Sequence, residues 1–349
     1  MRSEIITLLR QRGTYVSGQE LCERFGVSRT AVWKAVEQLK KDGYEIEAVK
    51  NRGYLLKEDA TRVFGRTEIE SRLKTDWIGQ NLHYFETIDS TNTQAKRLAE
   101  KGAPDGTLVV ADTQTAGRGR RGRSWASPAG TNLYFTVLLR PQIAPDKASM
   151  LTLVMALAVA RGIQAVTRSS ADLDKVSVLE NTGLADNNGP KVGIKWPNDI
   201  VVDGKKVCGI LTEMSLSLEQ GSIDYVVTGV GINVAAQKFD EEIRDRAVSL
   251  EEIFGTVNRC KLLDAVLRAF EGLYSQFLEK GDLSSLKASY DALLVNFGRQ
   301  VHVLDPKGEY DGIARGIRDT GELMVEIPGK EIRDVYAGEV SVRGIYGYV

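Results

Sequence analysis

The sequence predicts an α+β protein of three successive domains, and three observations support this fold class. The first 62 residues have the pattern of three helices followed by a short hairpin. The middle of the chain mixes strand-like apolar runs with helical patterns, and the residues from Arg299 onward show only short strand-like runs between turns. We therefore expect a winged helix-turn-helix at residues 1–62, a mixed α/β domain at residues 66–296 and a small β-barrel at residues 297–349.

The composition is that of an ordinary globular protein. The chain has 349 residues, of which 42% are hydrophobic and 27% charged, and its formal net charge is −1. So small a net charge excludes a globally basic nucleic-acid coat, and any DNA binding must come from a local patch. The three cysteines form no C-x-x-C pair, which argues against a disulfide framework and a zinc site. Because we find neither a signal-peptide core nor a membrane-spanning tract, we expect a cytoplasmic protein without a membrane partner.

The N-terminal segment has the pattern of a DNA-binding winged helix. The capping box Ser17-Gly18-Gln19-Glu20 opens the second helix, and Ser28 opens the third, whose outward face is polar and basic. A basic turn between two short strands follows this helix. The candidate DNA contacts are Ser28, Arg29, Thr30, Trp33, Lys34, Lys50 and Arg52.

The same segment carries a local positive charge. Met1 to Arg62 contain 12 Lys and Arg against 9 Asp and Glu, a net charge of +3 on a chain that is slightly acidic overall. Such a local excess is the electrostatic footprint of nucleic-acid binding. A small helical module that packs against another protein has the same pattern, so this alternative remains open.

The segment Gln114 to Trp125 is the most distinctive stretch of the central domain. It contains four arginines, three glycines and no acidic residue, and it lies between two apolar runs that we expect to be strands. Glycine allows the backbone to approach a ligand closely, and guanidinium groups bind carboxylates and phosphates with forked donors. The segment therefore predicts a loop for an anionic ligand, with a solvated charge run or a nucleic-acid contact as the alternative.

Further motifs surround this loop, and each also has a purely structural interpretation. Ser90-Thr91-Asn92 precedes a helix and is typical of a helix cap, Lys195-Trp196-Pro197-Asn198-Asp199 follows a strand, and Asn233 ends a glycine-bearing strand where a turn residue is common. Trp125 has the ordinary features of a core tryptophan. His83 and His302 lie near no motif, so we expect structural roles for them. Ser169 to Pro190 predict a surface insertion.

In this order the motifs resemble those of the biotin protein ligases, and the whole chain is similar to the bifunctional subgroup that unites a biotin ligase with a biotin-operon repressor. The arginine–glycine loop and the Lys195 to Asp199 motif carry most of the resemblance. It implies a biotin/lipoate-ligase-like central domain and an SH3-like barrel behind it. It also implies that ATP, with Mg²⁺, and biotin form biotinyl-5′-AMP, and that biotin passes to a lysine of the biotin carboxyl carrier protein of acetyl-CoA carboxylase.

The resemblance further implies that the protein is a repressor that binds operator DNA at biotin genes. In this role biotinyl-5′-AMP is the corepressor, and a ligand-linked homodimer is the species that binds the DNA. Two rival functions remain at this stage. One is a lipoate-type protein ligase, which shares the fold class and the acyl-adenylate chemistry. The other is a catalytically weak, biotin-sensing transcription factor, although such a sensor could discard Lys195, which this chain keeps.

The resemblance also implies residue roles. The biotin carboxylate and the ATP phosphates repel each other, so the site needs cations, and Lys195 and Arg120 are the expected catalytic residues. No residue is assigned to a metal. The expected biotin contacts are Ser90, Thr91, Asn92, Gln114, Gly117, Arg118, Gly119, Arg120 and Lys195. The expected ATP and adenylate contacts are Arg120, Arg123, Trp125, Lys195 and Asn233.

Overall fold

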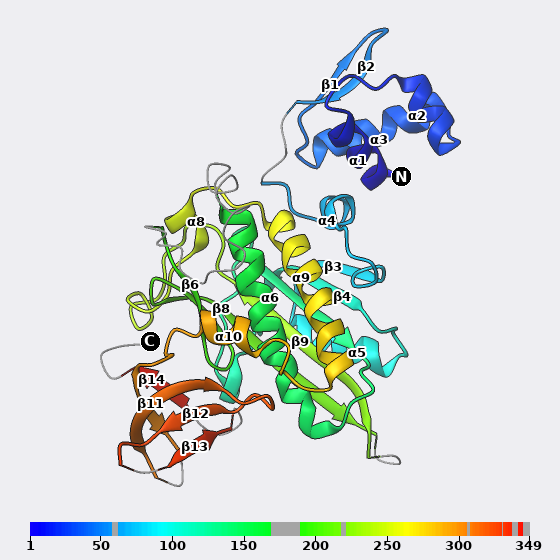
Figure 1. The fold of residues 1–349 in the computed structure, drawn as a ribbon. Coiled ribbons are helices and arrows are strands. Elements are labelled where there is room, and N and C mark those ends of the chain that lie inside the picture. Colours follow the sequence, from blue (N-terminus) through cyan, green and yellow to red (C-terminus); the bar gives the residue numbers. More distant parts are fainter. Residues whose placement is uncertain are drawn as a thin grey trace. The chain divides into compact units, whose positions relative to one another are not determined.

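A computed structural model describes residues 1–57, 62–168, 189–217, 221–305, 308–329, 331–336 and 341–344, the last segment by its backbone alone. Most of the predicted insertion at Ser169 to Pro190 lies outside the described residues. The chain divides into two compact units (Figure 1). One comprises Met1–Lys74 with Asn258–Lys261, and the other comprises Thr75–Val257 with Leu262–Val349. Each unit is described by itself.

The N-terminal unit has the predicted winged helix-turn-helix order. Its elements are α1 (Arg2–Arg12), α2 (Gly18–Phe25), α3 (Arg29–Lys41), β1 (Ile46–Val49), β2 (Gly53–Leu56) and α4 (Arg66–Arg72). Ser17 Oγ accepts from Glu20 N at 3.0 Å and Ser28 Oγ accepts from Ala31 N at 3.3 Å, so both predicted N-caps are confirmed. The capping box is only half formed, because the Glu20 carboxylate accepts from Arg12 at 2.9 Å instead.

A buried carboxylate ties α4 to the other N-terminal helices. Glu68 is fully buried on α4 and accepts hydrogen bonds from Arg10 at 3.0 Å, from Tyr44 at 2.7 Å and from Arg72. Burial of an ion is unfavourable unless it is paired, and these partners supply the pairing. Residues 66–72, which the sequence assigns to the start of the central domain, therefore pack as part of the N-terminal unit.

The second unit is built on a seven-stranded mixed sheet of order β3-β4-β5-β9-β8-β7-β6. Its strands are β3 (Leu82–Ile88), β4 (Thr107–Gln114), β5 (Leu133–Leu139), β6 (Val192–Lys195), β7 (Asp199–Val202), β8 (Lys205–Leu216) and β9 (Ile223–Ile232). Only the β3–β4 pair is parallel among these pairs. A turn at Asp203-Gly204 joins β7 to β8, with positive φ at both residues.

Two helices cover opposite faces of this sheet. Helix α5 (Thr91–Glu100) packs through Ala95 and Ala99 onto Leu138 and Val227. Successive residues of a strand point to opposite faces, so the face that carries Thr212 and Thr228 is the other one. There Thr152 of α6 (Met150–Thr167) donates to Thr212 at 2.9 Å. Gly229 and Gly231 also lie on the α5 face, and Gly229 lies against Asn92 in the first turn of α5.

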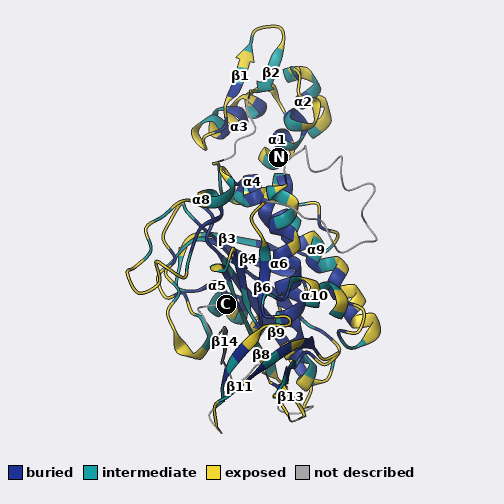
Figure 2. Ribbon diagram, turned by 60° about the vertical axis from the view of Figure 1, so that its left-hand side comes forward, coloured by how far each residue is buried: buried dark blue, intermediate teal, exposed yellow. Residues whose placement is uncertain are grey.

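Helix α6 is the core helix that its nearly uniform apolarity predicts, and Figure 2 shows it in the colour of buried residues. The helical stretch Pro145–Thr167, which begins with η2 (Pro145–Ser149), is the one described stretch long and apolar enough to cross a membrane by length and composition alone. The apolar part of this stretch is 67% buried inside the unit, as is typical of a core helix. On its outer side, Gly162 allows Val266 of α9 (Arg259–Lys280) to approach closely.

The C-terminal residues form a five-stranded antiparallel sheet of order β13-β12-β11-β10-β14. Its strands are β10 (Gln300–Leu304), β11 (Tyr310–Ile317), β12 (Leu323–Glu326), β13 (Ile332–Val335) and β14 (Ser341–Gly344), which follow α8 (Leu250–Phe254), α9 and α10 (Lys287–Leu293). Two hydrogen bonds join the C-terminal part of the chain to β6 and to Trp196, the residue that follows β6. Val295 N donates to Ile194 O at 3.0 Å, and Trp196 Nε1 donates to Gly321 O at 3.0 Å. Trp196 is therefore a buried link between β6 and the C-terminal sheet.

Candidate active site

A cavity of about 430 Å³ opens on the α5 face of the central sheet. Gly209 on β8 and Gly229 and Gly231 on β9 contribute to its wall. A Cβ atom at Gly229 would lie 1.9 Å from Asn92 Oδ1, and one at Gly231 would lie 2.6 Å from Trp125 Nε1. Glycine is needed at these positions because side chains from other elements lie directly on the strands.

The arginine segment folds as a small hairpin at this cavity. Gly119 N donates to Arg123 O at 2.7 Å, and the 3₁₀ turn η1 (Arg120–Gly122) forms the tip. There Arg121 (φ 58°) and Gly122 (φ 68°) both adopt the left-handed conformation. Two consecutive left-handed residues are the pattern of a type I′ turn, whose twist suits a hairpin. All four arginines of this hairpin line the cavity: Arg118, Arg120, Arg121 and Arg123.

Arg120 is a half-buried arginine of this hairpin that lines the cavity. Its guanidinium NH1 donates to Asn198 Oδ1 at 2.9 Å. Burial lowers the pKa of Arg120; the charge of Asp199 opposes this, and Arg121 and Arg123 lower the pKa further. Arginine nevertheless stays protonated in proteins. Its positive charge is therefore held at an energetic cost that an anion in the cavity would reduce.

At one end of the cavity, Ser90, Thr91 and Gln114 form a polar wall. Gln114 Oε1 accepts from Thr91 N at 2.9 Å and from Thr91 Oγ1 at 3.1 Å, and Gln114 Nε2 donates to Ser127 Oγ at 2.9 Å. Ser90 is the N-cap residue of α5, but its side chain makes no capping hydrogen bond. The interpretation of this triplet as a simple cap is therefore wrong for Ser90, which lines the cavity.

Asn92 is oriented by neighbouring side chains. Its Nδ2 donates to Glu213 Oε2 at 2.9 Å and to a backbone carbonyl of β8 at 3.1 Å, and its Oδ1 accepts from Thr136 at 2.7 Å. Burial alone would raise the pKa of Glu213, but hydrogen bonds from Lys96 and Asn92, together with nearby positive charge, lower it. Glu213 is therefore a carboxylate at neutral pH, and it fixes the amide of Asn92 in one orientation.

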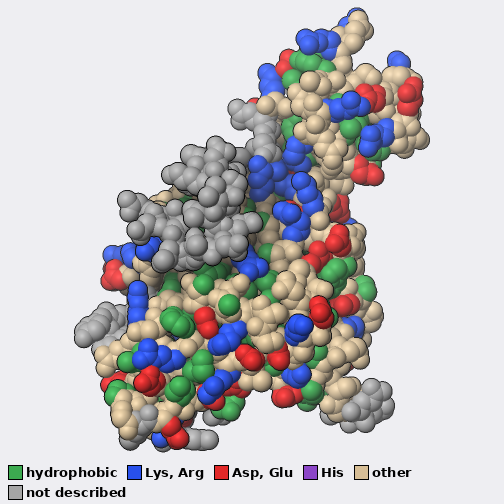
Figure 3. All heavy atoms as spheres, in the orientation of Figure 1, with side chains coloured by type: hydrophobic (Ala, Val, Ile, Leu, Met, Phe, Trp, Pro, Cys, Tyr) green, Lys and Arg blue, Asp and Glu red, His purple; other side chains and the backbone are tan. Residues whose placement is uncertain are grey.

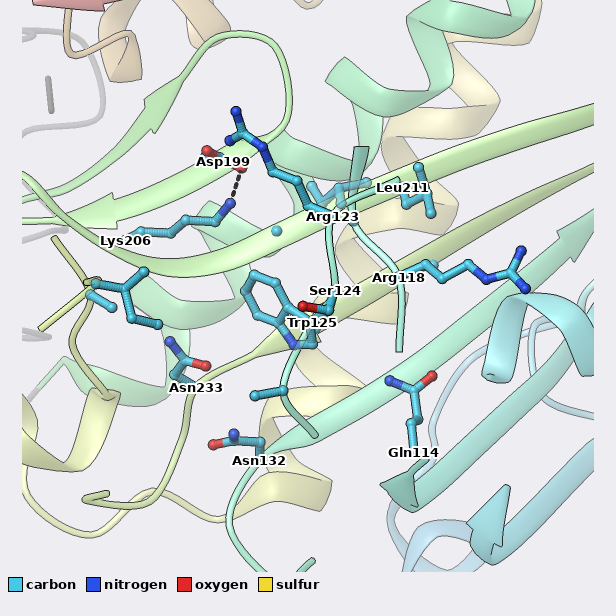
Figure 4. Close-up of a pocket in the computed structure, with 18 of the residues that line it drawn as sticks. Gln114, Arg118, Arg123, Ser124, Trp125, Asn132, Asp199, Lys206, Leu211 and Asn233 are labelled. Carbon is cyan, nitrogen blue, oxygen red and sulfur yellow. Dashed lines mark ion pairs between the residues drawn. The ribbon is translucent and has the colours of Figure 1, made fainter. Parts of the chain in front are cut away.

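The other end of the cavity is organised around Trp125 (Figure 4). Its indole lies against the glycines of β8 and β9, and Lys206 Nζ lies 5.2 Å from the ring centroid. Lys206 also pairs with Asp199 at 2.6 Å, as the dashed line in Figure 4 marks. Trp125 Nε1 is buried and has no hydrogen-bond partner within the described part of the chain. An orphan donor in a cavity wall indicates a place for an acceptor atom of a ligand.

Trp125 lines the cavity and packs on the glycines of the sheet. Asn233 lines the cavity, and its Nδ2 donates to Val248 O at 3.3 Å. Gly117 and Lys195 do not line the cavity. Lys195 is buried at the end of β6, where its register partner is Asp199, which does line the cavity.

Sequence reasoning missed part of the wall. Asn198, Asp199 and Lys206 belong to the quoted motifs, but no role was assigned to them. Asn132 and the segment from Gln237 to Ala247 also line the cavity. The available signal in that segment was an apolar pair, Phe239 and Ile243, among charged residues; Ile243 is 44% exposed.

The predicted DNA contacts lie together on the N-terminal unit. Arg29, Thr30, Trp33 and Lys34 are exposed on the first turns of α3, and Trp33 is 55% exposed. In the wing, Lys50 is exposed and the Arg52 guanidinium lies 4.2 Å from the centroid of the Tyr15 ring. Ser28 acts as the N-cap of α3. Figure 3 shows Lys and Arg side chains at the wing end of this unit.

Comparison with known proteins relates this architecture to one family. Three family models match the chain: the HTH domain over residues 2–55, the Biotin/lipoate A/B protein ligase family over residues 84–233, and the Biotin protein ligase C terminal domain over residues 297–343. The bifunctional ligase/repressor BirA of Bacillus subtilis is 37% identical over 346 residues, which cover 98% of each chain. The chain belongs to the family of bifunctional biotin ligase/repressors. The predicted family, three-part fold and functional class are thereby confirmed.

Other biotin ligases extend the similarity. The bifunctional ligase/repressor BirA of Escherichia coli is 31% identical over 97% of this chain and 96% of its own length. The solved structure of the biotin protein ligase from Aquifex aeolicus in complex with biotin and ATP is 31% identical, with a TM-score of 0.60 over 76% of this chain and 99% of that chain. For a biotin ligase, a cavity with a neutral polar end and an arginine-rich end is the arrangement that two different substrates need.

Proposed function

We propose that this biotin ligase binds biotin at the Ser90–Gln114 end of the cavity and the adenylate at the Trp125 end, and transfers biotin to a lysine of the biotin carboxyl carrier protein of acetyl-CoA carboxylase in the cytoplasm. The observation that carries the proposal is the half-buried guanidinium of Arg120, which lines the cavity and is oriented by Asn198. It is the place where a carboxylate and a phosphate would meet.

The neutral end suits the uncharged ring system of biotin. Thr91, Gln114 and Asn92 already bond to one another or to the sheet, so their remaining donors and acceptors are fixed in space. Gly117 supports this wall, because a Cβ atom there would lie 2.5 Å from Trp125 O. Ser90, Arg118 and Gly119 complete the proposed biotin contacts. Pre-organised polar groups give specificity because they need not be ordered on binding.

The basic end suits the nucleotide. We propose that Arg120 and Arg123 meet the phosphates, that the Trp125 indole packs on the nucleotide with its unpaired N–H directed to an acceptor, and that Asn233 contacts the adenine or ribose. Lys195 is the register partner of Asp199, which lines the cavity. We propose that Lys195 stabilises the charge that develops as the biotin carboxylate attacks the α-phosphorus. Pyrophosphate leaves, and the carrier lysine then attacks the biotinyl carbonyl and releases AMP.

Mg²⁺ is part of the proposed chemistry, and the residues present are compatible with it. Mg²⁺ at nucleotide sites is usually held by one or two carboxylates together with substrate phosphates and water. Asp199 brings a carboxylate to the cavity wall beside Arg120 and Lys206. When bound, the ion would neutralise phosphate charge and favour departure of pyrophosphate.

The test is incubation with ATP, Mg²⁺, biotin and a carboxylase carrier domain, followed by mass measurement of the carrier. We expect one biotin on one lysine. Lipoate offered in parallel should not be attached, and attachment of lipoate in preference to biotin would contradict the proposal.

We further propose that the N-terminal unit binds operator DNA as part of a homodimer whose formation biotinyl-5′-AMP favours. One winged helix with a net charge of +3 makes few phosphate contacts and binds weakly at physiological salt, so two copies on a palindrome are needed. Fluorescence anisotropy on the upstream region of the protein's own biotin genes tests this. Equal midpoints with and without biotinyl-5′-AMP would contradict the coupling, and absence of binding in both would contradict the repressor function.

A further inference from the structure

We infer that Asn198 is a positioning residue that holds the Arg120 guanidinium in place for the adenylate; this inference rests on the proposed role of Arg120. Asn198 follows the Trp196-Pro197 step between β6 and β7, and it lines the cavity. Arg120 NH1 donates to its Oδ1 at 2.9 Å. This contact joins the tip of the arginine hairpin to the sheet.

The amide of Asn198 is held firmly enough to act as a fixed acceptor. Its Nδ2 donates to Ile210 O at 3.1 Å, and Ile210 N donates to Asn198 O at 2.9 Å. Two bonds to one residue of β8 therefore fix both the backbone and the side chain. A carbonyl can only accept and a guanidinium can only donate, so these partners together require the observed orientation of the amide.

A neutral acceptor is the right group at this place. It orients the Arg120 guanidinium without forming an ion pair with it. A carboxylate at position 198 would form an ion pair with Arg120 and compete with the phosphate. Asp199, the next residue, has a carboxylate, but Lys206 pairs with it at 2.6 Å. The Asn-Asp order thus separates the neutral group that positions Arg120 from the carboxylate that pairs with Lys206.

The test uses the full-length protein with radiolabelled biotin and ATP, and measures release of biotinyl-5′-AMP after a chase with unlabelled biotin. Asn198→Ala should speed release by about tenfold, the effect of losing a hydrogen bond to a charged group. Asn198→Asp should raise the KM for ATP more than Asn198→Ala does, because only the aspartate neutralises Arg120. A general loss of stability would not raise the KM for ATP more in the aspartate variant than in the alanine variant.

A double-mutant cycle decides whether Asn198 acts through Arg120. The variant Arg120→Ala/Asn198→Ala should release the adenylate no faster than Arg120→Ala alone, since both changes remove one unit. Asn81→Ala is the matched control: Asn81 is also half-buried, donates one side-chain bond to Thr107 at 3.0 Å and lies outside the cavity wall, so its release rate should equal that of the wild type.

The outcomes separate this inference from the proposed function. If Arg120→Ala speeds release while Asn198→Ala does not, or if the two effects add, the positioning role of Asn198 is wrong and the role of Arg120 stands. If Arg120→Ala itself leaves release unchanged, the proposed function of Arg120 is wrong and the inference falls with it.

Discussion

Two regions of this molecule concentrate positive charge, and they hold it differently. In the arginine hairpin, Arg120 is half-buried, its partner Asn198 is itself fixed by Ile210, and its pKa is lowered by burial. On the N-terminal unit, Lys34 and Lys50 are exposed to solvent. A buried, oriented cation can stabilise charge at one point of a reaction, whereas exposed cations can follow a phosphate backbone and are screened by salt.

The difference indicates how each region should respond to mutation. Substitutions in the catalytic region should change one rate by a large factor, and the effect should depend on the exact group removed. Substitutions on the DNA-binding face should change an affinity by a modest factor that falls as salt rises. We expect the effects of the following substitutions to decrease from Lys195 to Arg121.

Lys195→Ala should lower the rate of adenylate formation by roughly 10²–10³, because it removes a cation that meets charge developing in the transition state. Lys195 is buried at the end of β6, whereas Lys191, just before the same strand, is exposed. Lys191→Ala is therefore the control and should retain the wild-type rate. Pyrophosphate release measures both, and an unchanged rate in Lys195→Ala would remove this residue from the mechanism.

Arg120→Gly should release biotinyl-5′-AMP at least about tenfold faster, since it loses a charge-assisted bond to the adenylate. Bystander proteins should then be biotinylated at exposed lysines, which mass spectrometry detects. The assignment fails if this variant labels only its carrier protein, at a reduced rate.

Lys34→Ala should weaken binding to the upstream region of the biotin genes severalfold and lower the slope of log affinity against log salt by about 0.9, the contribution of one phosphate contact. Lys41, exposed at the last turn of the same helix, provides the control. Fluorescence anisotropy at several salt concentrations gives both numbers. A large loss that does not vary with salt would assign Lys34 to base recognition instead.

Arg121→Asn should have the smallest effect and the opposite sign. Arg121 adopts φ 58° at the tip of the hairpin, a conformation that asparagine accepts more readily, and Asn-Gly is the preferred pair for a type I′ turn. We expect adenylate release to slow by about two- to fivefold, which corresponds to roughly 0.5–1 kcal/mol of turn stabilisation. Arg121→Lys keeps both the positive charge and the unfavourable left-handed backbone conformation, so it should release the adenylate at the wild-type rate. Faster release in Arg121→Asn would contradict this expectation and would show that the charge of Arg121 matters more than the turn.

Local sequence signals predicted local structure well. Ser17 and Ser28 begin helices, Asp203-Gly204 closes a hairpin, and the apolar residues of α6 are buried, because each depends on residues close in the chain. The glycines of the arginine segment likewise predicted a tight loop, and Gly122 is at its tip.

Contacts between distant residues could not be predicted from single motifs. Trp125 lies against Gly231 because of the hairpin geometry and the register of β8 and β9, and Arg120 meets Asn198 across 78 positions of sequence. Glu68 packs with the N-terminal unit through Arg10 and Tyr44, although it lies in the range that the sequence assigns to the central domain. In the segment from Gln237 to Ala247, the apolar pair Phe239 and Ile243 does not by itself indicate which surface of the protein the segment covers.

The central claim is that the cavity beneath the arginine hairpin activates biotin with ATP while the exposed cations of the N-terminal unit bind DNA. Formation of biotinyl-5′-AMP, measured by rapid quench in wild type, Lys195→Ala and Lys34→Ala, tests it most directly. We predict that Lys195→Ala loses adenylate formation and that Lys34→Ala matches the wild type. Equal rates in all three proteins, or a loss in Lys34→Ala as large as in Lys195→Ala, would contradict this division of labour.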